Sequence, residues 1–457
     1  MKPNFLLNLV GPKVTFIKTL IRTLRNLLRL HNASEYAFWR TLYLIDLLNS
    51  EIQTPEWKNV QELNSKHRLE IEVSNQQYSR NDIESYMRVR RELIAKKPTF
   101  NTFVDRVPSN TYLLGNEFTS QFGHITQIID YFRGKQLGNF EVSPLIVASD
   151  FSNSWLYSEY ISNLMPLLPV SKSTNELLQV QFLDRYLHPS IMPSANDWNH
   201  FFEVHNEIES SWLTAKLGPV LKLSQNDLDF GYQELAKAFG VGHDSKLVTI
   251  HFRNDPRYHS ARNVDPKSYA LSIQWLLDND YWVLLLGDSF SPDLSIRHPR
   301  YLNYCNSAIR SDRLDLFVLA ISQFMVGCSS GPSEIPNLFG KLLLWTNITQ
   351  LGRHDYKSNA LMLPKLFYSR QSSNFKSNLE LGVLDTESQT SIEGIWRDNS
   401  ESEILTAIQG ICEFLEQDGA ELERGPLFLN LEKLANKKFT IIPEFFLEKH
   451  QNYFFKS

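Results

Sequence analysis

From residue 98 onward, short apolar runs alternate with amphipathic stretches of helical length. Apolar runs at 112–114 and 145–147 are each followed by such a stretch, at 125–132 and 155–164. This alternation is typical of parallel sheets covered by helices, because successive parallel strands need a long crossover connection. The sequence therefore predicts the α/β class for most of the chain.

The same alternation returns more clearly after residue 246. Strands are expected at 247–250, 281–286, 324–326 and 342–345, and helices at 269–277 and 314–321. Two α/β halves result, with a junction near residue 230. The predicted division is a helical N-terminal region over 1–98, Rossmann-like domains over 99–230 and 231–425, and a C-terminal helical segment over 426–457 that packs back on the first domain.

Composition excludes several classes of protein. The 457 residues are 42% hydrophobic and 21% charged, which is the balance of a globular protein, and the net charge of −5 gives no basic field for nucleic acid. The three cysteines are far apart in sequence and form no C-x-x-C pair, so we expect no structural metal and a reducing, cytoplasmic compartment. The sequence also lacks G-x-G-x-x-G, G-x-x-x-x-G-K-[ST] and H-E-x-x-H.

The first thirty residues predict a basic amphipathic helix over 13–30. Apolar residues step by three and four along one face (Val14, Ile17, Ile21, Leu24, Leu28), and basic residues take the same step on another (Lys18, Arg22, Arg25, Arg29). The charges interrupt every apolar run, so neither a membrane-spanning helix nor a secretory signal is expected. Two interpretations stay open: the helix lies on an anionic inner leaflet, or it packs on the protein itself.

Polar residues gather where the strand at 247–250 ends. His251 and Arg253 follow this strand on the same side of an extended chain, and Arg262 comes soon after. A guanidinium offers a fork of donors that suits two phosphate oxygens. The alternative is a structural histidine beside an arginine that is paired to Asp255 or Asp265.

A second strand end carries small and hydroxyl-bearing residues. The strand at 324–326 leads into a turn with these candidate nucleotide-binding residues: Ser329, Ser330, Gly331, Ser333 and Glu334. A turn of this kind exposes backbone N–H groups and a helix start, both of which bind anionic oxygens. The alternative is an ordinary strand-to-helix connection that Ser330 or Ser333 caps.

Two further positions are weaker candidates. Gly287 and Asp288 follow the strand at 281–286; the glycine permits close backbone approach, and the carboxylate accepts from a sugar hydroxyl or else caps the next turn. Gly123 and His124 open the expected helix at 125–132, where the histidine either contacts a substrate or lies at the surface.

The order and spacing of these pieces resemble a family of bacterial glycosyltransferases from surface-polysaccharide and O-antigen gene clusters. The residues that carry the resemblance are 247–255, Arg262–Asp265, Leu286–Asp288, Gly327–Pro336 with Phe339–Gly340, and 441–449. Gly123–His124 matches a Gly-His of that family's first domain. His251-x-Arg253 is similar to the H-x-R of α1,6- and nodulation fucosyltransferases. The chain departs from the family at Phe252, which replaces an aliphatic residue, and at Asn254, which displaces the acidic residue to Asp255.

The resemblance implies a GT-B fold, with the acceptor on the first domain and the nucleotide-sugar donor on the second, closed by a C-terminal crossing helix. It implies that Arg253 neutralises the donor diphosphate. From the residues themselves, we expect Arg262, Asn263, Gly287, Asp288 and the turn residues to lie around the nucleotide. Asp255, His251 and His124 are the unranked candidates for the general base.

The sequence thus predicts a glycosyltransferase that acts on a glycan or lipid-linked acceptor, in the cytoplasm or at the inner membrane. It needs no cofactor beyond the nucleotide-diphosphate sugar, no metal and no nucleic acid. Two alternatives stay open: a non-catalytic protein that binds nucleotide-sugars or glycans, and a phosphate-group transferase that uses the same turn.

Overall fold

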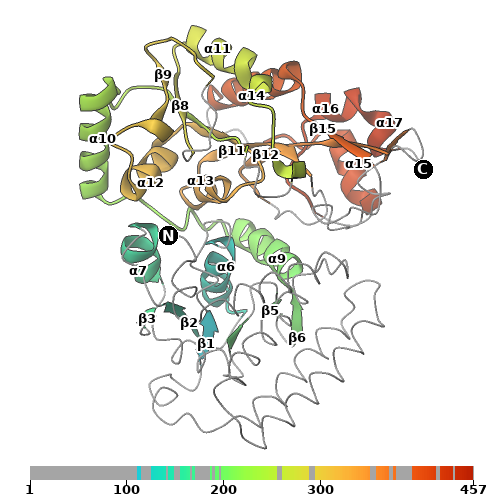
Figure 1. The fold of residues 1–457 in the computed structure, drawn as a ribbon. Helices are drawn as coiled ribbons and strands as arrows, with labels where there is room; N and C mark the ends of the chain where they lie inside the picture. The colour runs from blue at the N-terminus through green and yellow to red at the C-terminus, as the bar shows by residue number, and fades with distance from the viewer. Residues whose placement is uncertain are drawn as a thin grey trace, which may run out of the picture.

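The structure of the protein is a computed structural model. It describes residues 111–114, 125–139, 143–148, 155–164, 167–169, 186–187, 191–194, 197–254, 260–287, 294–349, 357–369, 374–376, 394–417, 422–435 and 438–455. The expected N-terminal helical region, including the basic helix at 13–30, lies outside these residues. The described residues form two halves, one above the other in Figure 1.

The first half contains a parallel sheet of four strands. Their order is β3 (Leu167–Pro169), β2 (Ser143–Ala148), β1 (Thr111–Leu114), β4 (Tyr186–Leu187). Between these strands run α6 (Ile125–Gln136) and the π-helical turn η3 (Leu156–Ile161), which continues into α7 (Ser162–Leu164). An antiparallel pair, β5 (Ile191–Ser194) and β6 (Asp197–His200), then leads into α9 (Phe201–Thr214), which packs beside α6.

The second half contains a parallel sheet of six strands. Their order is β12 (Ala360–Pro364), β11 (Leu342–Ile348), β10 (Phe324–Gly327), β7 (Leu247–Ile250), β8 (Trp282–Leu285), β9 (Tyr301–Leu302). Numbered along the chain from β7, this is the doubly wound order 3-2-1-4-5-6 of a Rossmann sheet. The expected α/β class is therefore confirmed, with two parallel, Rossmann-like sheets.

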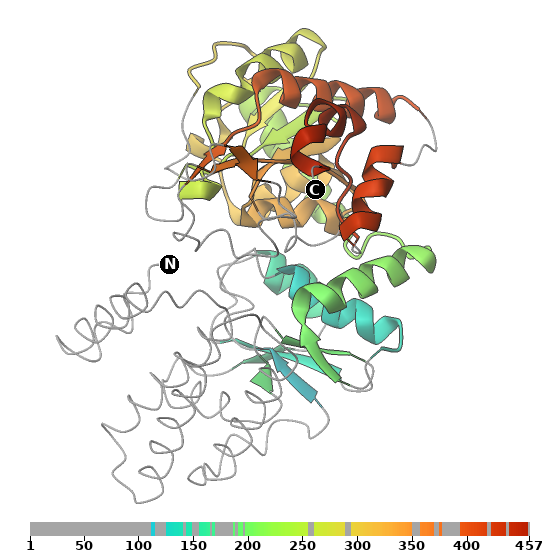
Figure 2. The same ribbon diagram turned by 90° about the vertical axis from the view of Figure 1, so that its right-hand side faces the viewer.

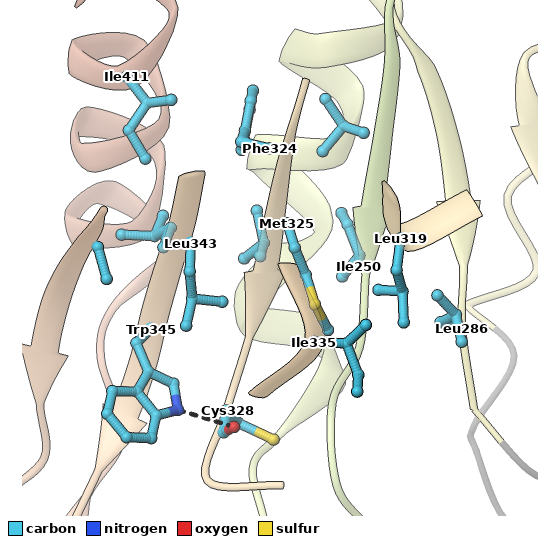
Figure 3. Close-up of a cluster of buried hydrophobic side chains, with 14 of the residues drawn as sticks. Ile250, Leu286, Leu319, Phe324, Met325, Cys328, Ile335, Leu343, Trp345 and Ile411 are labelled. Carbon is cyan, nitrogen blue, oxygen red and sulfur yellow. Dashed lines mark hydrogen bonds between the residues drawn. The ribbon is translucent and has the colours of Figure 1, made fainter. Parts of the chain in front are cut away.

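Helices cover both faces of the second sheet. In Figure 1, α12 (Asp312–Ile321) and α13 (Ile335–Leu338) lie between the sheet and the first half, and α11 (Ala270–Asp278) and α14 (Glu401–Leu415) lie on the far side. Figure 3 shows how both layers meet the central strands: Leu319 and Ile335 approach from one side and Ile411 from the other. All four residues of β7 and of β10 are buried, so these strands are covered on both faces rather than alternating between core and solvent.

Further helices, four 3₁₀ turns and a small antiparallel sheet complete the second half. They are α10 (Gln225–Phe239), the 3₁₀ turns η4 (Ser260–Arg262), η5 (Pro266–Tyr269), η6 (Tyr304–Asn306) and η7 (Gly331–Glu334), and an antiparallel sheet of β14 (Asn374–Lys376), β13 (Leu366–Ser369) and β15 (Gly394–Arg397). The chain ends in α15 (Pro426–Ala435), α16 (Glu444–Lys449) and α17 (Gln451–Phe454), which Figure 2 shows at the front of this half. Among the described residues, no helix is long and apolar enough to cross a membrane.

The contacts of the C-terminal segment run to both halves. Met362 of β12 donates its amide to Ile441 at 2.7 Å, and the Tyr453 hydroxyl accepts from the amide of Phe367. Lys438 reaches Ser210 of α9 in the first half at 3.0 Å. The predicted junction near residue 230 falls inside α10, and the division into domains stays a prediction.

The link between the halves, at 215–224, is packed rather than loose. Gly340 has a φ of 69°, and a Cβ there would lie 2.6 Å from a ring carbon of Pro219. The amide of Leu221 donates to Leu338 at 2.8 Å. Glycine at 340 thus meets a conformational and a steric requirement at the point where the link crosses α13.

A polar cluster fastens η3 to the start of α10. Asp227 accepts hydrogen bonds from the Tyr160 hydroxyl and from Ser224, and it pairs with Arg313 at 2.6 Å. The Arg313 guanidinium also lies 4.6 Å from the ring centroid of Trp155. Burial raises the pKa of Asp227, but these donors outweigh it and hold the pKa below its ordinary value.

We predict that Glu403→Gln lowers the free energy of unfolding by about 2 kcal/mol at neutral pH, the usual loss for a hydrogen bond to a charged group. Glu403 completes a capping box with Ser400 and accepts from His450 at 2.6 Å and Lys449 at 2.8 Å, which ties α16 to α14. Urea unfolding measures the difference.

These partners outweigh burial and hold the pKa of Glu403 well below its ordinary value of 4.5. A depressed pKa stabilises the fold fully above the unfolded value and loses that contribution as the pH falls toward the folded value. The difference between wild type and variant should therefore shrink below pH 4.5. Glu401→Gln, an exposed site on the same helical turn, is the control; an equal loss there would contradict the prediction.

Candidate functional site

The order of the second sheet creates one switch point, between β7 and β10. These strands are neighbours, and the connections that follow them go to opposite faces of the sheet: η5 and α11 follow β7, and η7 and α13 follow β10. In open α/β sheets, ligands bind beyond the carboxyl ends of the strands at such a point. The polar residues that follow β7 and those that follow β10 therefore meet at one place.

His251 joins three strand ends. Its amide donates to Val326 of β10 at 2.8 Å, its Nδ1 lies 3.1 Å from the carbonyl oxygen of Leu286 beyond β8, and its Nε2 lies 2.9 Å from the Ser330 hydroxyl. A carbonyl can only accept, so Nδ1 carries the hydrogen. In the neutral ring Nε2 then accepts from Ser330. His251 is buried, and these bonds hold its ring at the centre of the switch point.

We call residues 328–334 the serine turn; side chains behind it hold it in place. The carbonyl oxygen of Cys328 accepts from Ser333 at 2.8 Å and from the Trp345 indole at 3.0 Å, the bond drawn in Figure 3. Ser330 precedes η7 but makes no side-chain cap bond, so its hydroxyl is turned toward His251. The capping alternative therefore fails for both Ser330 and Ser333 in this structure.

Three cations surround the buried thiol of Cys328. Burial raises the pKa of this thiol to about 11, and the amide of Arg253 and the charges of Arg262, Arg253 and Lys365 act in the opposite direction. The guanidinium of Arg262 donates twice to the carbonyl oxygen of Ser329, at 2.9 and 3.1 Å. The Arg262 guanidinium therefore lies against the backbone of the serine turn.

Lys365 and Asp398 hold the segment that carries Arg262. The Lys365 ammonium, 2% exposed, donates to the carbonyl oxygen of Asn263 at 2.6 Å and pairs with Asp398 at 2.7 Å. Asp398 also accepts from the amide of Asp265 at 2.8 Å. Asn263 thus contributes its backbone to this arrangement.

A buried hydrogen-bond chain supports the turn from β11. The Tyr269 hydroxyl lies 2.6 Å from Thr346, which donates to the carbonyl oxygen of Gly327 at 2.8 Å. Asn347, with a φ of 58°, donates to the same tyrosine, and its backbone and side chain exchange bonds with Asn399. This chain fixes the last residue of β10, from which the serine turn starts.

Glu334 ends the serine turn at the boundary between the halves. Its Oε2 accepts from the Thr126 hydroxyl of α6 at 2.7 Å and from the Lys357 ammonium at 2.5 Å. The carboxyl end of the second sheet therefore contacts the N-terminal turn of α6.

The structure brings most of the predicted site residues together. His251, Ser329, Ser330, Ser333 and Arg262 are linked as described, and Gly287 is buried directly after Leu286. Arg253 joins them through its amide, 3.2 Å from the sulfur of Cys328, and Gly331 begins η7. His124, Asp255 and Asp288 lie outside the described residues.

Sequence reasoning missed Lys365, Asp398, Tyr269 and Lys357. For Lys365 a signal exists: it is the one charge between the apolar runs 360–364 and 366–367, and a buried lysine needs partners. For Asp398 and Lys357 the sequence offers no comparable signal. No group of three or more His, Cys, Asp or Glu side chains that would hold a metal occurs in the part of the chain that the structure describes.

Fold and site together define a two-sheet α/β protein with a cationic, hydroxyl-lined switch point in its second sheet. No family model and no curated protein matches the chain. Among solved structures it is similar to the ADP-heptose lipopolysaccharide heptosyltransferase II of E. coli, at 12% identity over 68% of this chain and 100% of that one, with a TM-score of 0.42. A glycosyl transferase family 9 structure from Veillonella parvula follows at 11% identity over 74% and 80%, with a TM-score of 0.32. At these scores the similarity carries no conclusion about activity.

We predict that Gly327→Ala displaces the serine turn and lowers stability by about 1–3 kcal/mol, as overpacking commonly does. A Cβ at Gly327 would lie 2.4 Å from the Ser333 hydroxyl oxygen. Denaturant unfolding measures the loss. The double variant Gly327→Ala/Ser333→Ala removes the obstructing atom and should recover part of it.

Gly410→Ala is the matched control. Gly410 is exposed in α14, and a Cβ there would have nothing within 4 Å, so this variant should gain about 0.5–1 kcal/mol from helix propensity. A Gly327→Ala protein as stable as wild type would show that the turn is not held as closely as described.

Proposed function

We propose that the protein is a glycosyltransferase that moves a sugar from a nucleotide-diphosphate donor to a glycan or lipid-linked acceptor in bacterial surface-polysaccharide synthesis. The observation that carries the proposal is the switch point of the second sheet, where His251 joins Ser330, the Arg262 guanidinium bonds to Ser329 and the Arg253 amide meets Cys328. A fixed cationic edge of this kind suits a diphosphate.

The proposed transfer step depends on stabilising the negative charge of the leaving group. Breaking the bond between sugar and diphosphate leaves negative charge on the departing phosphate oxygens. Donors fixed before the reaction stabilise that charge, and the loss of one typically costs ~10²–10³ in rate. We assign this role to Arg253 and Arg262, with Ser329, Ser330 and the backbone of Gly331 as further donors, and we place the nucleotide against Asn263, Gly287, Asp288 and Glu334.

The second substrate has a place in the same architecture. The first half turns α6 toward the serine turn, through Thr126 and Glu334, so an acceptor held on that half would face the donor. Both ring nitrogens of His251 have protein partners, which favours a positioning role for it. We therefore propose Asp255 or His124 as the general base that takes the proton of the acceptor hydroxyl.

The first test is a ligand-induced thermal shift against UDP-, GDP-, CMP- and dTDP-linked sugars. A ligand at 100 times its Kd stabilises by ~2.7 kcal/mol. We expect a shift with one nucleotide family, and we expect Arg253→Ala to abolish it. Arg300→Ala should retain the thermal shift. Arg300 lies just before β9, at the amino end of that strand, where it pairs with Asp280 and not with the carboxyl ends that form the switch point.

The outcomes separate the candidate functions. Transfer or slow hydrolysis of the sugar, with a nucleoside diphosphate as product, supports the proposal. Binding without turnover under every acceptor favours the alternative, a non-catalytic nucleotide-sugar or glycan-binding protein. A nucleoside monophosphate released from a UDP-, GDP- or dTDP-linked sugar would point to phosphate-group transfer, whereas from a CMP-linked sugar it is the product of sugar transfer itself. No shift in a folded sample would argue against a nucleotide site at this switch point.

We also propose that the protein works in the cytoplasm and reaches a lipid-linked acceptor through its basic segment at 13–30. Each basic residue near an anionic leaflet contributes about 1 kcal/mol. The protein should therefore float with anionic liposomes, and the change of Lys18, Arg22, Arg25 and Arg29 to Glu should abolish flotation. Unaltered flotation of that variant would contradict a role for this segment.

A further inference from the structure

We infer that Thr126 and Glu334 form a positioning pair that seats helix α6 of the first half on the serine turn of the second. The inference rests on the proposed function, and it gives Glu334 a task beyond contact with the donor. The two residues are 208 positions apart in the sequence and meet through a hydrogen bond of 2.7 Å.

The pair is buried together with a third group. Thr126, Glu334 and Lys357 are 7%, 8% and 4% exposed, and the same oxygen of Glu334 accepts from both partners. Taking a carboxylate and an ammonium out of water costs several kcal/mol per ion, and an apolar contact of the same size is often more stable. A buried ionic contact is thus a poor way to gain stability, but its directional bonds define one orientation of the parts that it joins.

A second, partly buried contact lies beside the first. Ser358, the neighbour of Lys357, donates to Glu209 of α9 at 2.9 Å, and Glu209 pairs with Arg133 of α6. Burial raises the pKa of Glu209, but Arg133, His205, Ser358 and Lys357 outweigh it and lower the pKa, so the carboxylate is ionised. Glu334 and Ser358 thus hold α6 and α9 at two points, which restricts rotation as well as translation.

The contact between Thr126 and Glu334 should affect the reaction rate, because of where Thr126 lies in α6. Thr126 lies in the first turn of α6, two residues after His124, a candidate base. Reaction between two substrates requires the reacting atoms to be about 3–3.5 Å apart, and a 1 Å misplacement can cost 10²-fold in rate. A change at Thr126 should therefore slow the transfer step while the donor binds normally in the second half.

The test compares Thr126→Val, which keeps the shape and removes the hydroxyl, with Thr126→Ser, which keeps the hydroxyl. We expect Thr126→Val to lower kcat about 10- to 100-fold with the donor Kd changed less than about twofold, and Thr126→Ser to retain activity within about threefold. Thr214→Val is the matched control, because Thr214 is exposed and bonds only within its own helix, to Ser210, among the described residues. It should behave as wild type.

A second measurement does not depend on turnover. Hydrogen exchange in peptides that cover 125–136 and 331–338 should be faster in Thr126→Val than in wild type, and unchanged in Thr214→Val. If no donor supports transfer, the proposed function fails while exchange still tests the contact. Unchanged exchange and kcat in a folded Thr126→Val protein would overturn the inference, as would an equal loss of donor affinity that Thr126→Ser does not rescue.

Discussion

The carboxyl edge of the second sheet depends on the hydrogen bonds of the His251 imidazole. Strand order places β7 between β8 and β10, so a residue that follows β7 can reach both neighbours, and His251 does so through Leu286 and Ser330. Each of these bonds satisfies one ring nitrogen of the buried imidazole. The sheet edge is therefore organised by polar pairing as much as by the apolar packing beneath it.

Further hydrogen bonds hold the serine turn from two sides. Behind the serine turn, Thr346 of β11 donates to the carbonyl oxygen of Gly327, and the Tyr269 hydroxyl of η5 bonds to Thr346. In front of it, Glu334 meets Thr126 and Lys357 at the other half. The turn is thus supported from the core on one side and from the partner half on the other, which limits the conformations it can adopt before a ligand arrives and lowers the entropy cost of binding.

Much of this could be predicted, because the strong signals are local. The runs at 247–250 and 324–326 form central strands, and the rule for parallel sheets brings their polar ends to one edge. Strand order is different: it depends on the packing of the whole chain, and nothing within either run states that they are neighbours. The contact of Thr126 with Glu334 is beyond sequence reasoning for the same reason, and so is that of Asp398, which meets Asp265 from 133 residues away. At 155–164 the pattern predicts a helix, but most of the segment is a π-helix, whose i→i+5 bonds the sequence pattern does not reveal.

The packed link at 215–224 has a mechanical consequence. Among the described residues the chain passes between the halves there, and the cluster of Tyr160, Asp227 and Arg313 fastens that side. Thr126 of α6 bonds to Glu334, which directly precedes α13, and the link bonds to Leu338, the last residue of the same helix. The link and the first half therefore act on opposite ends of one short helix, so a displacement of either reaches the other through a single turn of backbone.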